Sequence, residues 1–324
     1  MYDLTVIGNS PVDALTHVDE SILTKYKLNK GDFNPVPTET FAEIAQSCTF
    51  EALESGGSTA NTAWTLGVMG KYIHFIGHIG DDPAGRHFYK DMQTAEVEMR
   101  APDKNARTME VFVLITPDGE RTFISRGVTA PLRHEMIDED IIKNSNWLLV
   151  EGYALLDQSD AVKKSIQWAL KHDTKIAFTV SAAFAIQIAF NTMAEDVIPY
   201  TDLLIANDEE MDTLIDAANK MEKGTQKTNL LETLSKMAKI ITHSEKGATF
   251  SQGGQKQFMP TDAIDDVLDA TGAGDAFVAG FLYGYIENDV QKGLRIGHKL
   301  GGKIIQQLGG RIKDKTFIKE SINN

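Results

Sequence analysis

The sequence predicts an α/β protein with a doubly wound, mostly parallel central sheet, helices on both faces and a small β-rich lid. Three observations lead to this prediction. Beyond residue 138, short apolar strands alternate with helical stretches, as in sheets whose crossovers cover both faces. A buried strand pattern also opens the chain and ends at Gly8. A hairpin pattern between residues 109 and 125 lies outside this alternation and supplies the β-rich part.

Composition excludes several classes of function. The 324 residues include 32 Lys and Arg against 46 Asp and Glu, a net charge of −14, and we find no basic patch for nucleic acid. The single cysteine, Cys48, rules out an intramolecular disulfide and suits a reducing compartment. No apolar run approaches the roughly 18 residues of a membrane span, and no signal peptide is evident. We therefore expect a cytoplasmic protein without nucleic-acid or membrane partners.

The first strand, Leu4 to Gly8, leads into a polar turn that carries Asp13. Ligands of open α/β sheets bind just beyond the carboxyl ends of the strands, where this turn lies. Because one carboxylate can accept two hydrogen bonds side by side, Asp13 could hold two vicinal hydroxyls of a sugar. Asp13 could equally cap the turn, and the sequence leaves both interpretations open.

Two stretches depart from the strand–helix alternation. Residues 14–55 have weak periodicity, and residues 100–127 contain the hairpin around Thr116-Pro117-Asp118-Gly119-Glu120. We expect both excursions to form a small lid on one domain that covers residues 1–324. The hairpin could close over a site and exclude water, or it could be an ordinary edge hairpin.

A glycine turn opens the next helix and is a candidate ligand-binding element. Gly56 and Gly57 precede a run of small residues in which Asn61 is a polar exception. Because glycine has no side chain, the main chain can approach a ligand closely there. Tight packing of the helix against the sheet is the alternative, and the polar Asn61 favours contact with a ligand.

The second half of the chain supplies the regular alternation. The expected strands are 147–150, 175–180, 202–206 and 239–242, and the expected helices are 157–172, 183–195, 208–221 and 228–237. Near the C-terminus, residues 301–311 have the pattern of a small-residue helix that ends at a glycine. We expect this helix to pack near the one that starts at Asp275.

Two strand ends in this half carry polar groups. Asn207 and Glu210, three residues apart, would share one face of a starting helix and could supply oxygen ligands to a Mg²⁺–phosphate assembly. The same spacing is that of a helix capping box. Thr242, Ser244 and Gly247 lie in a polar turn that could line a nucleotide or simply connect two elements.

The most specific stretch is Asp269-Ala270-Thr271-Gly272-Ala273-Gly274-Asp275, which runs directly into an apolar helix pattern. The backbone amides of Gly272, Ala273 and Gly274 would form an anion cradle at the helix N-terminus. Beside it, Asp275 could take a proton from a hydroxyl that attacks phosphorus. A capping aspartate after a glycine turn is the plainer interpretation.

The order of these motifs resembles that of the PfkB carbohydrate kinases, the ribokinase-like kinases, over essentially the whole chain. The family carries a Gly-Gly…Asn motif early, an Asn-x-x-Glu motif in the middle and an Asp-x-Thr-Gly-Ala-Gly-Asp motif late. Here these are Gly56-Gly57…Asn61, Asn207…Glu210 and Asp269 to Asp275. The resemblance implies a ribokinase-like fold and phosphorylation of an alcohol, with ATP and Mg²⁺ as cofactors.

The resemblance also implies roles for individual residues. Asp275 would be the catalytic base, and the amides of Gly272 to Gly274 would be the anion hole. The residues that match acceptor contacts are Asp13, Gly56, Gly57 and Asn61, and those that match the nucleotide and its metal are Asn207, Glu210, Thr242, Ser244 and Gly247. Asp269 and Thr271 match part of a site for a monovalent cation such as K⁺, which many members contain and which backbone oxygens near Gly309 would complete.

Within the family, Gly8-Asn9…Asp13 and Glu151-Gly152-Tyr153 look most like the adenosine-kinase-type branch. We therefore expect a kinase, monomeric or homodimeric, that phosphorylates the 5′-hydroxyl of a ribonucleoside, most naturally adenosine. Two departures blur this preference: Ser181-Ala182-Ala183-Phe184 lacks the aspartate that often follows this strand, and Ser244 replaces a common glycine. The alternatives are a sugar kinase of the fructokinase or ribokinase type and a non-catalytic nucleoside-binding protein.

Overall fold

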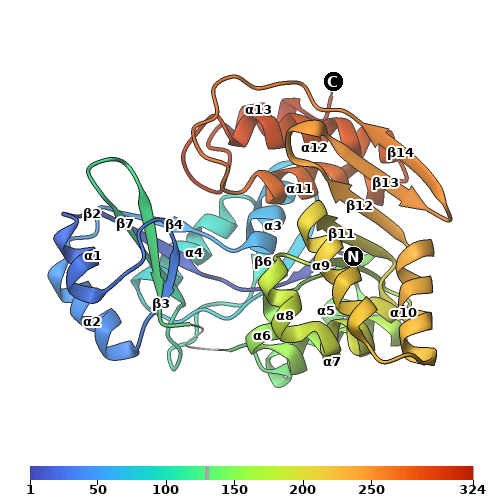
Figure 1. Ribbon diagram of the computed structural model, residues 1–324, viewed down its shortest axis with the longest axis horizontal. Coiled ribbons are helices and arrows are strands. Elements are labelled where there is room, and N and C mark those ends of the chain that lie inside the picture. Colours follow the sequence, from blue (N-terminus) through green and yellow to red (C-terminus); the bar gives the residue numbers. More distant parts are fainter. Residues whose placement is uncertain (128–130, 324) are drawn as a thin grey trace.

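In the computed structural model, which describes residues 1–127 and 131–323, the strands form a nine-stranded and a five-stranded sheet (Figure 1). From one edge to the other, the strands of the larger sheet are β14 (Gln255–Met259), β13 (Ala248–Gln252), β12 (Ala238–Thr242), β11 (Leu203–Asn207), β10 (Lys175–Thr179), β9 (Trp147–Glu151), β1 (Leu4–Ile7), β5 (Ile73–Ile76) and β6 (Glu98–Met99). The strands from β12 to β6 are parallel, and β13 and β14 are antiparallel at one edge. The predicted parallel core of the fold is therefore confirmed.

Two layers of helices cover the larger sheet, because successive residues of its buried strands point to opposite faces. On β9, Leu149 joins one apolar cluster, whereas Leu148 and Val150 join the other. The first layer contains α3 (Ser58–Val68), α4 (Pro83–Gln93), α11 (Ala273–Ile286), α12 (Val290–Ile304) and α13 (Lys315–Glu320). The second layer contains α5 (Glu139–Lys143), α6 (Ala154–Asp157), α7 (Ser159–Lys171), α8 (Ala183–Thr192), α9 (Asp208–Lys220) and α10 (Thr225–Lys236). This is the doubly wound arrangement that the sequence predicts.

The smaller sheet stands apart from the larger one, at the left of Figure 1. Its strands in spatial order are β3 (Phe33–Pro35), β8 (Arg121–Ser125), β7 (Glu110–Ile115), β2 (Val12–His17) and β4 (Ala52–Ser55). Two helices, α1 (Ser21–Tyr26) and α2 (Thr38–Ser47), belong to the same part of the chain. Phe41 of α2 stacks on Phe112 of β7 with ring centroids 3.8 Å apart, within a separate apolar cluster. The irregular stretches of the sequence thus build a second, independently packed β-rich unit.

The structure differs from the sequence-based expectations in several places. Asp13 lies within β2 rather than in a turn, because residues 12–17 pair with β4 and β7. Residues 248–259 form the hairpin of β13 and β14, whose turn residues Gly253 and Gly254 have φ of +58° and +83°, as two-residue hairpin turns require. The expected helix over 301–311 is wrong in extent, because α12 ends at Ile304. The chain beyond it turns towards the loop before α11, where the Gly309 amide donates to Asp269 Oδ2 at 3.1 Å.

None of the helices in the described residues has both the length and the apolar character required to traverse a bilayer.

Candidate active site

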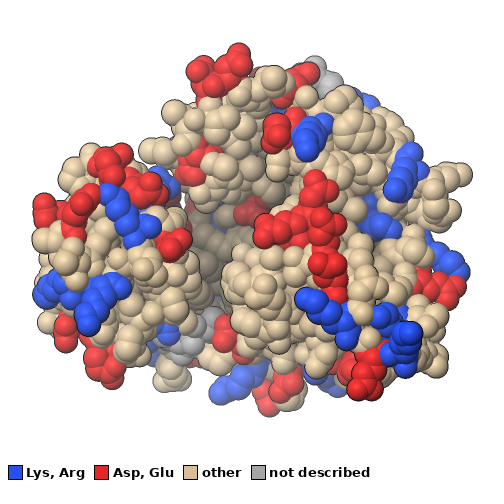
Figure 2. Space-filling view, in the orientation of Figure 1, with Lys and Arg blue, Asp and Glu red and all other residues tan. Residues whose placement is uncertain are grey.

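A cavity of about 290 Å³ opens beyond the carboxyl ends of β1, β9 and β10, next to the smaller sheet. Figure 2 shows a deep hollow between the lobe of the smaller sheet and the rest of the molecule. The cavity is lined by Asp13, Gly56, Gly57, Asn61, Thr271 and Asp275, together with Glu54, Ser55, Ser58, Tyr153, Ser181 and Gly310. The first six are site residues that the sequence predicts, and the fold brings them to one place.

Asp275 lies in the first turn of α11 and is held by two residues of α3. Its Oδ1 accepts a hydrogen bond from Ser58 Oγ at 2.6 Å, and its Oδ2 accepts one from Asn61 Nδ2 at 2.9 Å. Burial raises the pKa of Asp275 to about 6, although these hydrogen bonds and the charge of Arg311 oppose the rise. A carboxylate with this pKa is a stronger base than an exposed one and is still ionised near neutral pH.

The loop before α11 is shaped by Gly272, which caps the helix in the left-handed region with φ of +77°. A Cβ at this position would lie 2.5 Å from the Gly310 carbonyl oxygen, so only glycine fits. The Ala273 amide donates to the Ala270 carbonyl oxygen at 3.2 Å, closing the turn. The amides of Gly272 and Gly274, on either side of Ala273, lie at the N-terminus of the 14-residue helix α11. The helix dipole favours a bound anion at this end.

Two carboxylates face each other on the smaller sheet at the other side of the cavity. Asp13 of β2 and Glu54 of β4 are directly opposite in the antiparallel register, so their side chains lie on the same face. Burial and the nearby Glu54 raise the pKa of Asp13 to about 7, while Arg121 and Arg311 act in the opposite direction. The sequence predicts Asp13 but not Glu54, because their pairing depends on a register between distant strands.

Asp269 is already committed to protein donors. Its Oδ1 accepts from the Thr271 amide at 3.0 Å and from Thr271 Oγ1 at 2.6 Å, and its Oδ2 accepts from the Gly309 amide and from Arg121 Nη1 at 3.2 Å. Burial works to raise the pKa of Asp269, but these hydrogen bonds and the Arg121 charge bring it below its ordinary value. A monovalent cation at this loop would therefore use main-chain oxygens rather than this carboxylate.

A second, smaller cavity of about 100 Å³ shares Ser58, Ser181 and Asp275 with the first. Its other walls include Asn207, Glu210, Thr242 and Gly274, which the sequence assigns to the nucleotide side. Asp275 therefore lines both cavities.

The plain interpretation of Asn207 and Glu210 is also correct. Asn207 Oδ1 accepts from the Glu210 amide at 2.8 Å, and the Asn207 amide donates to Glu210 Oε2 at 3.0 Å, which completes a capping box at the start of α9. Burial raises the pKa of Glu210. The cap fixes both side chains at the cavity, so capping and ligand contact are compatible.

Ser244 and Gly247 lie in the turn after β12 rather than in either cavity beside Asp275. Both have positive φ, +50° for Ser244 and +124° for Gly247, and a Cβ on Gly247 would lie 2.2 Å from the Met259 carbonyl oxygen. Met259 in turn lines a larger pocket of about 570 Å³. Gly247 thus packs against Met259, one of the residues in the wall of this pocket.

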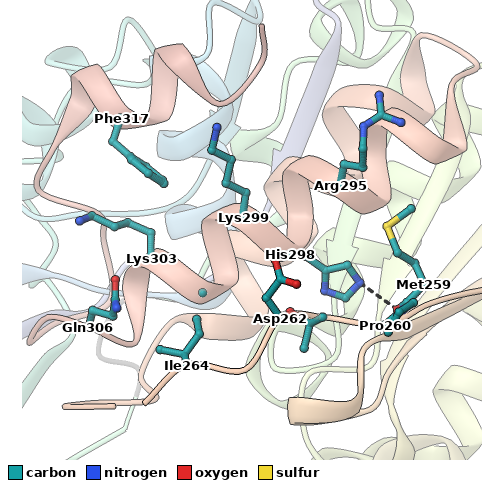
Figure 3. A pocket seen from close by; sticks show the side chains of 12 residues that line it. Met259, Pro260, Asp262, Ile264, Arg295, His298, Lys299, Lys303, Gln306 and Phe317 are labelled. Atoms are coloured by element: carbon teal, nitrogen blue, oxygen red, sulfur yellow. Dashed lines mark hydrogen bonds between the residues drawn. The ribbon is translucent and has the colours of Figure 1, made fainter. Parts of the chain in front are cut away.

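Figure 3 shows the larger pocket, which lies between α12 and the segment after β14. His298 Nε2 is 3.2 Å from the Met259 carbonyl oxygen, across the pocket wall. Three cations, Arg295, Lys299 and Lys303, project from one side of α12 along the pocket. Gly302 of the same helix lines the pocket, and its neighbour Gly301 packs against the start of α11, where a Cβ on Gly301 would lie 3.5 Å from the Ala273 carbonyl oxygen.

Besides Glu54, sequence reasoning assigns no site role to three further polar residues at or near the cavity, Ser58, Glu151 and Arg311. Ser58 directly follows the Gly56-Gly57 turn, and the sequence could have indicated it as a hydroxyl next to this predicted ligand-binding turn. Glu151 ends β9 and accepts from the Asn9 amide at 2.7 Å and from Thr59 Oγ1 at 2.7 Å, which ties the first strand turn to α3. Arg311 belongs to the irregular segment after α12, and no local pattern marks it.

Comparison with known proteins places these features in a family. The model of the pfkB family of carbohydrate kinases matches residues 31–316. An adenosine kinase of Dictyostelium discoideum is 27% identical over 94% of this chain and 95% of its own length. A 5-dehydro-2-deoxygluconokinase of Clostridium botulinum is 26% identical over 82% of this chain and 81% of its own length. The solved structure of an adenosine kinase from Sinorhizobium meliloti superimposes with a TM-score of 0.81 at 26% identity, covering 99% of this chain and 98% of that one.

Proposed function

The chain belongs to the pfkB family of carbohydrate kinases and is an ATP-dependent kinase with an alcohol acceptor, and we propose that this acceptor is the 5′-hydroxyl of a ribonucleoside, adenosine. The relatives include adenosine kinases and sugar kinases at similar identity, so the acceptor is argued from the site itself. Carboxylates in the wall of the acceptor cavity could bind the hydroxyls of a sugar, and an aromatic pair that includes the cavity residue Tyr153 could stack on a nucleobase.

The aromatic pair Tyr153 and Phe184 is the observation that carries the nucleoside. Tyr153 lines the acceptor cavity, and its ring lies 5.7 Å from that of Phe184, tilted by 42°. Phe184 is 51% exposed, so its ring is accessible to a ligand. Tyr153 at the cavity and Phe184 beside it together offer a stacking surface for a purine, whereas a free sugar has no aromatic ring to stack there.

The ribose is proposed to lie between this surface and Asp275. Asp13 accepts hydrogen bonds from the 2′- and 3′-hydroxyls, and Asn61 and the Gly56-Gly57 turn border the same space. The 5′-hydroxyl then reaches Asp275, which removes its proton as the oxygen attacks the γ-phosphorus of ATP. The proton ends on the Asp275 carboxylate. The bond between the γ-phosphorus and its bridging oxygen breaks, and ADP leaves on the side of the phosphorus opposite to the attacking 5′-oxygen.

ATP is proposed to occupy the nucleotide side of Asp275. Its base and ribose take the basic pocket of α12, and its phosphates run along Thr242 to the amides of Gly272 and Gly274. Magnesium would be held near Asn207 and Glu210, directly or through water, since both side chains offer oxygen donors at the second cavity. When bound, it neutralises charge on the transferring phosphate. We propose that a bound K⁺ would be held by main-chain oxygens near Gly309 and not by the Asp269 carboxylate.

The smaller sheet is proposed to act as a lid within a single domain. It carries Asp13 and Glu54 on the acceptor side, and its Arg121 contacts Asp269 on the nucleotide side. Closure of the sheet would exclude water from the reacting atoms and so limit ATP hydrolysis. We propose that the protein works in the cytoplasm and that each copy, alone or in a homodimer, has a complete site.

A panel of adenosine, ribose, fructose and 5-dehydro-2-deoxygluconate with Mg-ATP tests the proposal. We expect adenosine to give the highest kcat/KM, with the phosphate on the 5′-oxygen. Phosphorylation of the free sugars alone would favour the sugar-kinase alternative. Failure to release ADP with any acceptor would favour the third alternative, a nucleoside-binding protein.

A further inference from the structure

We propose that Arg311 is a positioning residue for phosphoryl transfer: it fixes the side-chain amide of Asn61 so that this amide holds the carboxylate of Asp275. The inference deepens the proposed function and rests on Asp275 being the base. Arg311 itself does not line the small cavity beside the phosphate loop, and its effect passes through Asn61.

Arg311 is held rigidly by two helices. Its side chain is 10% exposed. Nη1 pairs with the Asp91 carboxylate of α4, and Nη2 lies 3.8 Å from Met92 Sδ. The guanidinium also lies 5.6 Å from the Trp64 ring centre, above α3. A guanidinium with this many fixed contacts has little freedom left, so its remaining N–H groups point in fixed directions.

The Nε–H of Arg311 donates to Asn61 Oδ1 at 2.9 Å. An asparagine amide can rotate by half a turn and exchange its oxygen and nitrogen, but arginine has only donors. The amide oxygen must therefore face Arg311, and the nitrogen must face Asp275 Oδ2, 2.9 Å away. Asn61 is 6% exposed, so the wrong orientation would bury two donors against each other. Arg311 thereby ensures that the amide nitrogen of Asn61, and not its oxygen, faces the Asp275 carboxylate.

The charge of Arg311 also bears on Asp275. The ionisable groups that lie near Asp275 are Arg311 from the C-terminal segment, Asp13 of β2, which lines the same cavity, the buried Glu151 of β9, Tyr153 and Glu210. Arg311 lowers the pKa of both Asp275 and Asp13, whereas the charge of Asp275 raises the pKa of Glu151. Loss of the guanidinium should therefore raise the pKa of Asp275 above about 6.

A cavity next to Arg311 makes a direct rescue experiment feasible. Arg311 lines a space of about 320 Å³, with Trp64, Asp91, Lys313 and Lys315 among its walls. This space is large enough for a free guanidinium ion, whose volume is that of a few water molecules. Lys313 lines the same cavity but is not a partner of Asn61, so Lys313→Gln is a matched control.

The experiment compares Arg311→Ala, Arg311→Lys and Lys313→Gln with the wild type. For Arg311→Ala we expect kcat to fall roughly 100-fold with little change in KM for ATP, because a displaced base loses its alignment. The acid limb of its kcat/KM profile should move to higher pH, and millimolar guanidinium should restore part of kcat. Arg311→Lys keeps the charge and should keep the position of the acid limb while kcat falls. Lys313→Gln should match the wild type.

A readout without turnover separates this proposal from the acceptor proposal. The Asp275 carboxyl carbon is followed by NMR in protein with ¹³C-labelled aspartate, and Asp275→Asn identifies its signal. We expect the midpoint to rise in Arg311→Ala and to return with guanidinium. An unchanged midpoint, or a kcat of Arg311→Ala within threefold of the wild type, overturns the role of Arg311. If the wild type phosphorylated no acceptor, the proposed function would fall, and the NMR titration would still decide the contact. Arg311→Lys, checked by its melting temperature, serves if Arg311→Ala does not fold.

Discussion

At the scale of single residues, the site is a set of carboxylates in different electrostatic surroundings. Asp269 is saturated with donors and has a lowered pKa, whereas the pKa of Asp275 is raised to about 6 and that of Asp13 to about 7. Groups of the same type are thereby suited to different tasks: Asp269 supports a loop, and Asp275 is the proposed proton acceptor.

Asp275→Asn should abolish turnover while substrate binding survives. Asparagine keeps the size of the side chain and can still contact Ser58 and Asn61, but it cannot accept the hydroxyl proton. We expect kcat to fall at least ~1,000-fold, with the Kd for adenosine, measured by calorimetry, within a few-fold of the wild type. In the wild type, kcat/KM should rise with pH through about 6, where Asp275 loses its proton. A near-normal kcat in the variant would show that the base is another group.

Phe184→Ala should raise the KM for adenosine and leave any activity on free ribose unchanged. Loss of one stacking partner is worth about 1 kcal/mol, or about fivefold in KM. Ile188→Ala is the control, because Ile188 lies on the same helix, is 70% exposed and, unlike Phe184, has no aromatic ring to pair with Tyr153. Equal effects of the two substitutions, or equal losses with adenosine and ribose, would contradict a base-stacking role.

At the scale of elements, the site depends on a contact between the start of α11 and the segment after α12. Gly272 of the first and Gly310 of the second approach so closely that no side chain fits between them. The same segment supplies the Gly309 amide to Asp269 and the Arg311 side chain to Asn61. Residues 309–311 therefore hold both the loop before α11 and, through Asn61, the side chain of Asp275.

Gly272→Ala should destabilise the protein by about 2 kcal/mol or more, since alanine meets both a left-handed φ and the Gly310 oxygen. Gly274→Ala, two residues on, has open space around its Cβ and lies in the helix, so its stability should equal or slightly exceed the wild type. Urea unfolding of the three proteins measures both values. Equal stability of the two variants would mean that the Gly272–Gly310 contact is not tight in solution.

The sequence predicts the parts of the site that lie on local patterns. The glycine turn at 56–57, the capping box of Asn207 and Glu210 and the helix start at Asp275 each have their own periodic or turn signal, and each is found where expected. Arg311 and Glu54 have no such signal, because a side chain's partner across a sheet or beyond a helix end depends on tertiary packing. The predicted helix over residues 301–311 is wrong in extent for the same reason, because the end of α12 is determined by its contact with the segment before α11, where the Leu268 and Asp269 amides donate to the Ile305 carbonyl oxygen.

At the scale of the whole molecule, the two raised carboxylates make stability depend on pH. Asp13 and Asp275 have an ordinary pKa of 3.8, which the fold raises to about 7 and about 6. Between pH 4 and 7 the folded protein therefore keeps protons that the unfolded chain has released, and these two groups make stability fall as pH rises. The active site carries a cost in stability that is greatest above pH 7.

Asp13→Asn should relieve part of this cost. Asparagine resembles protonated aspartate, so the variant should match the wild type at pH 4 and exceed it at pH 8. We expect a gain on the order of 1–3 kcal/mol at pH 8, together with a large rise in the KM for the acceptor. Urea unfolding of both proteins from pH 4 to 8 measures the difference in their free energies of unfolding at each pH. The contributions of the titrating groups that the two proteins share cancel in this difference. A difference independent of pH would mean that Asp13 has an ordinary pKa.

The smaller sheet is built from two separate stretches of chain, with β5 and β6 of the larger sheet between them. Its central neighbours, β2 and β7, are parallel partners that come from different stretches. A change of acceptor by transplanting this sheet from a relative would therefore need two matched grafts, because either one alone would leave β2 or β7 with a foreign partner. Recombination at a single crossover would separate them, so the two stretches should be exchanged between relatives only as a pair.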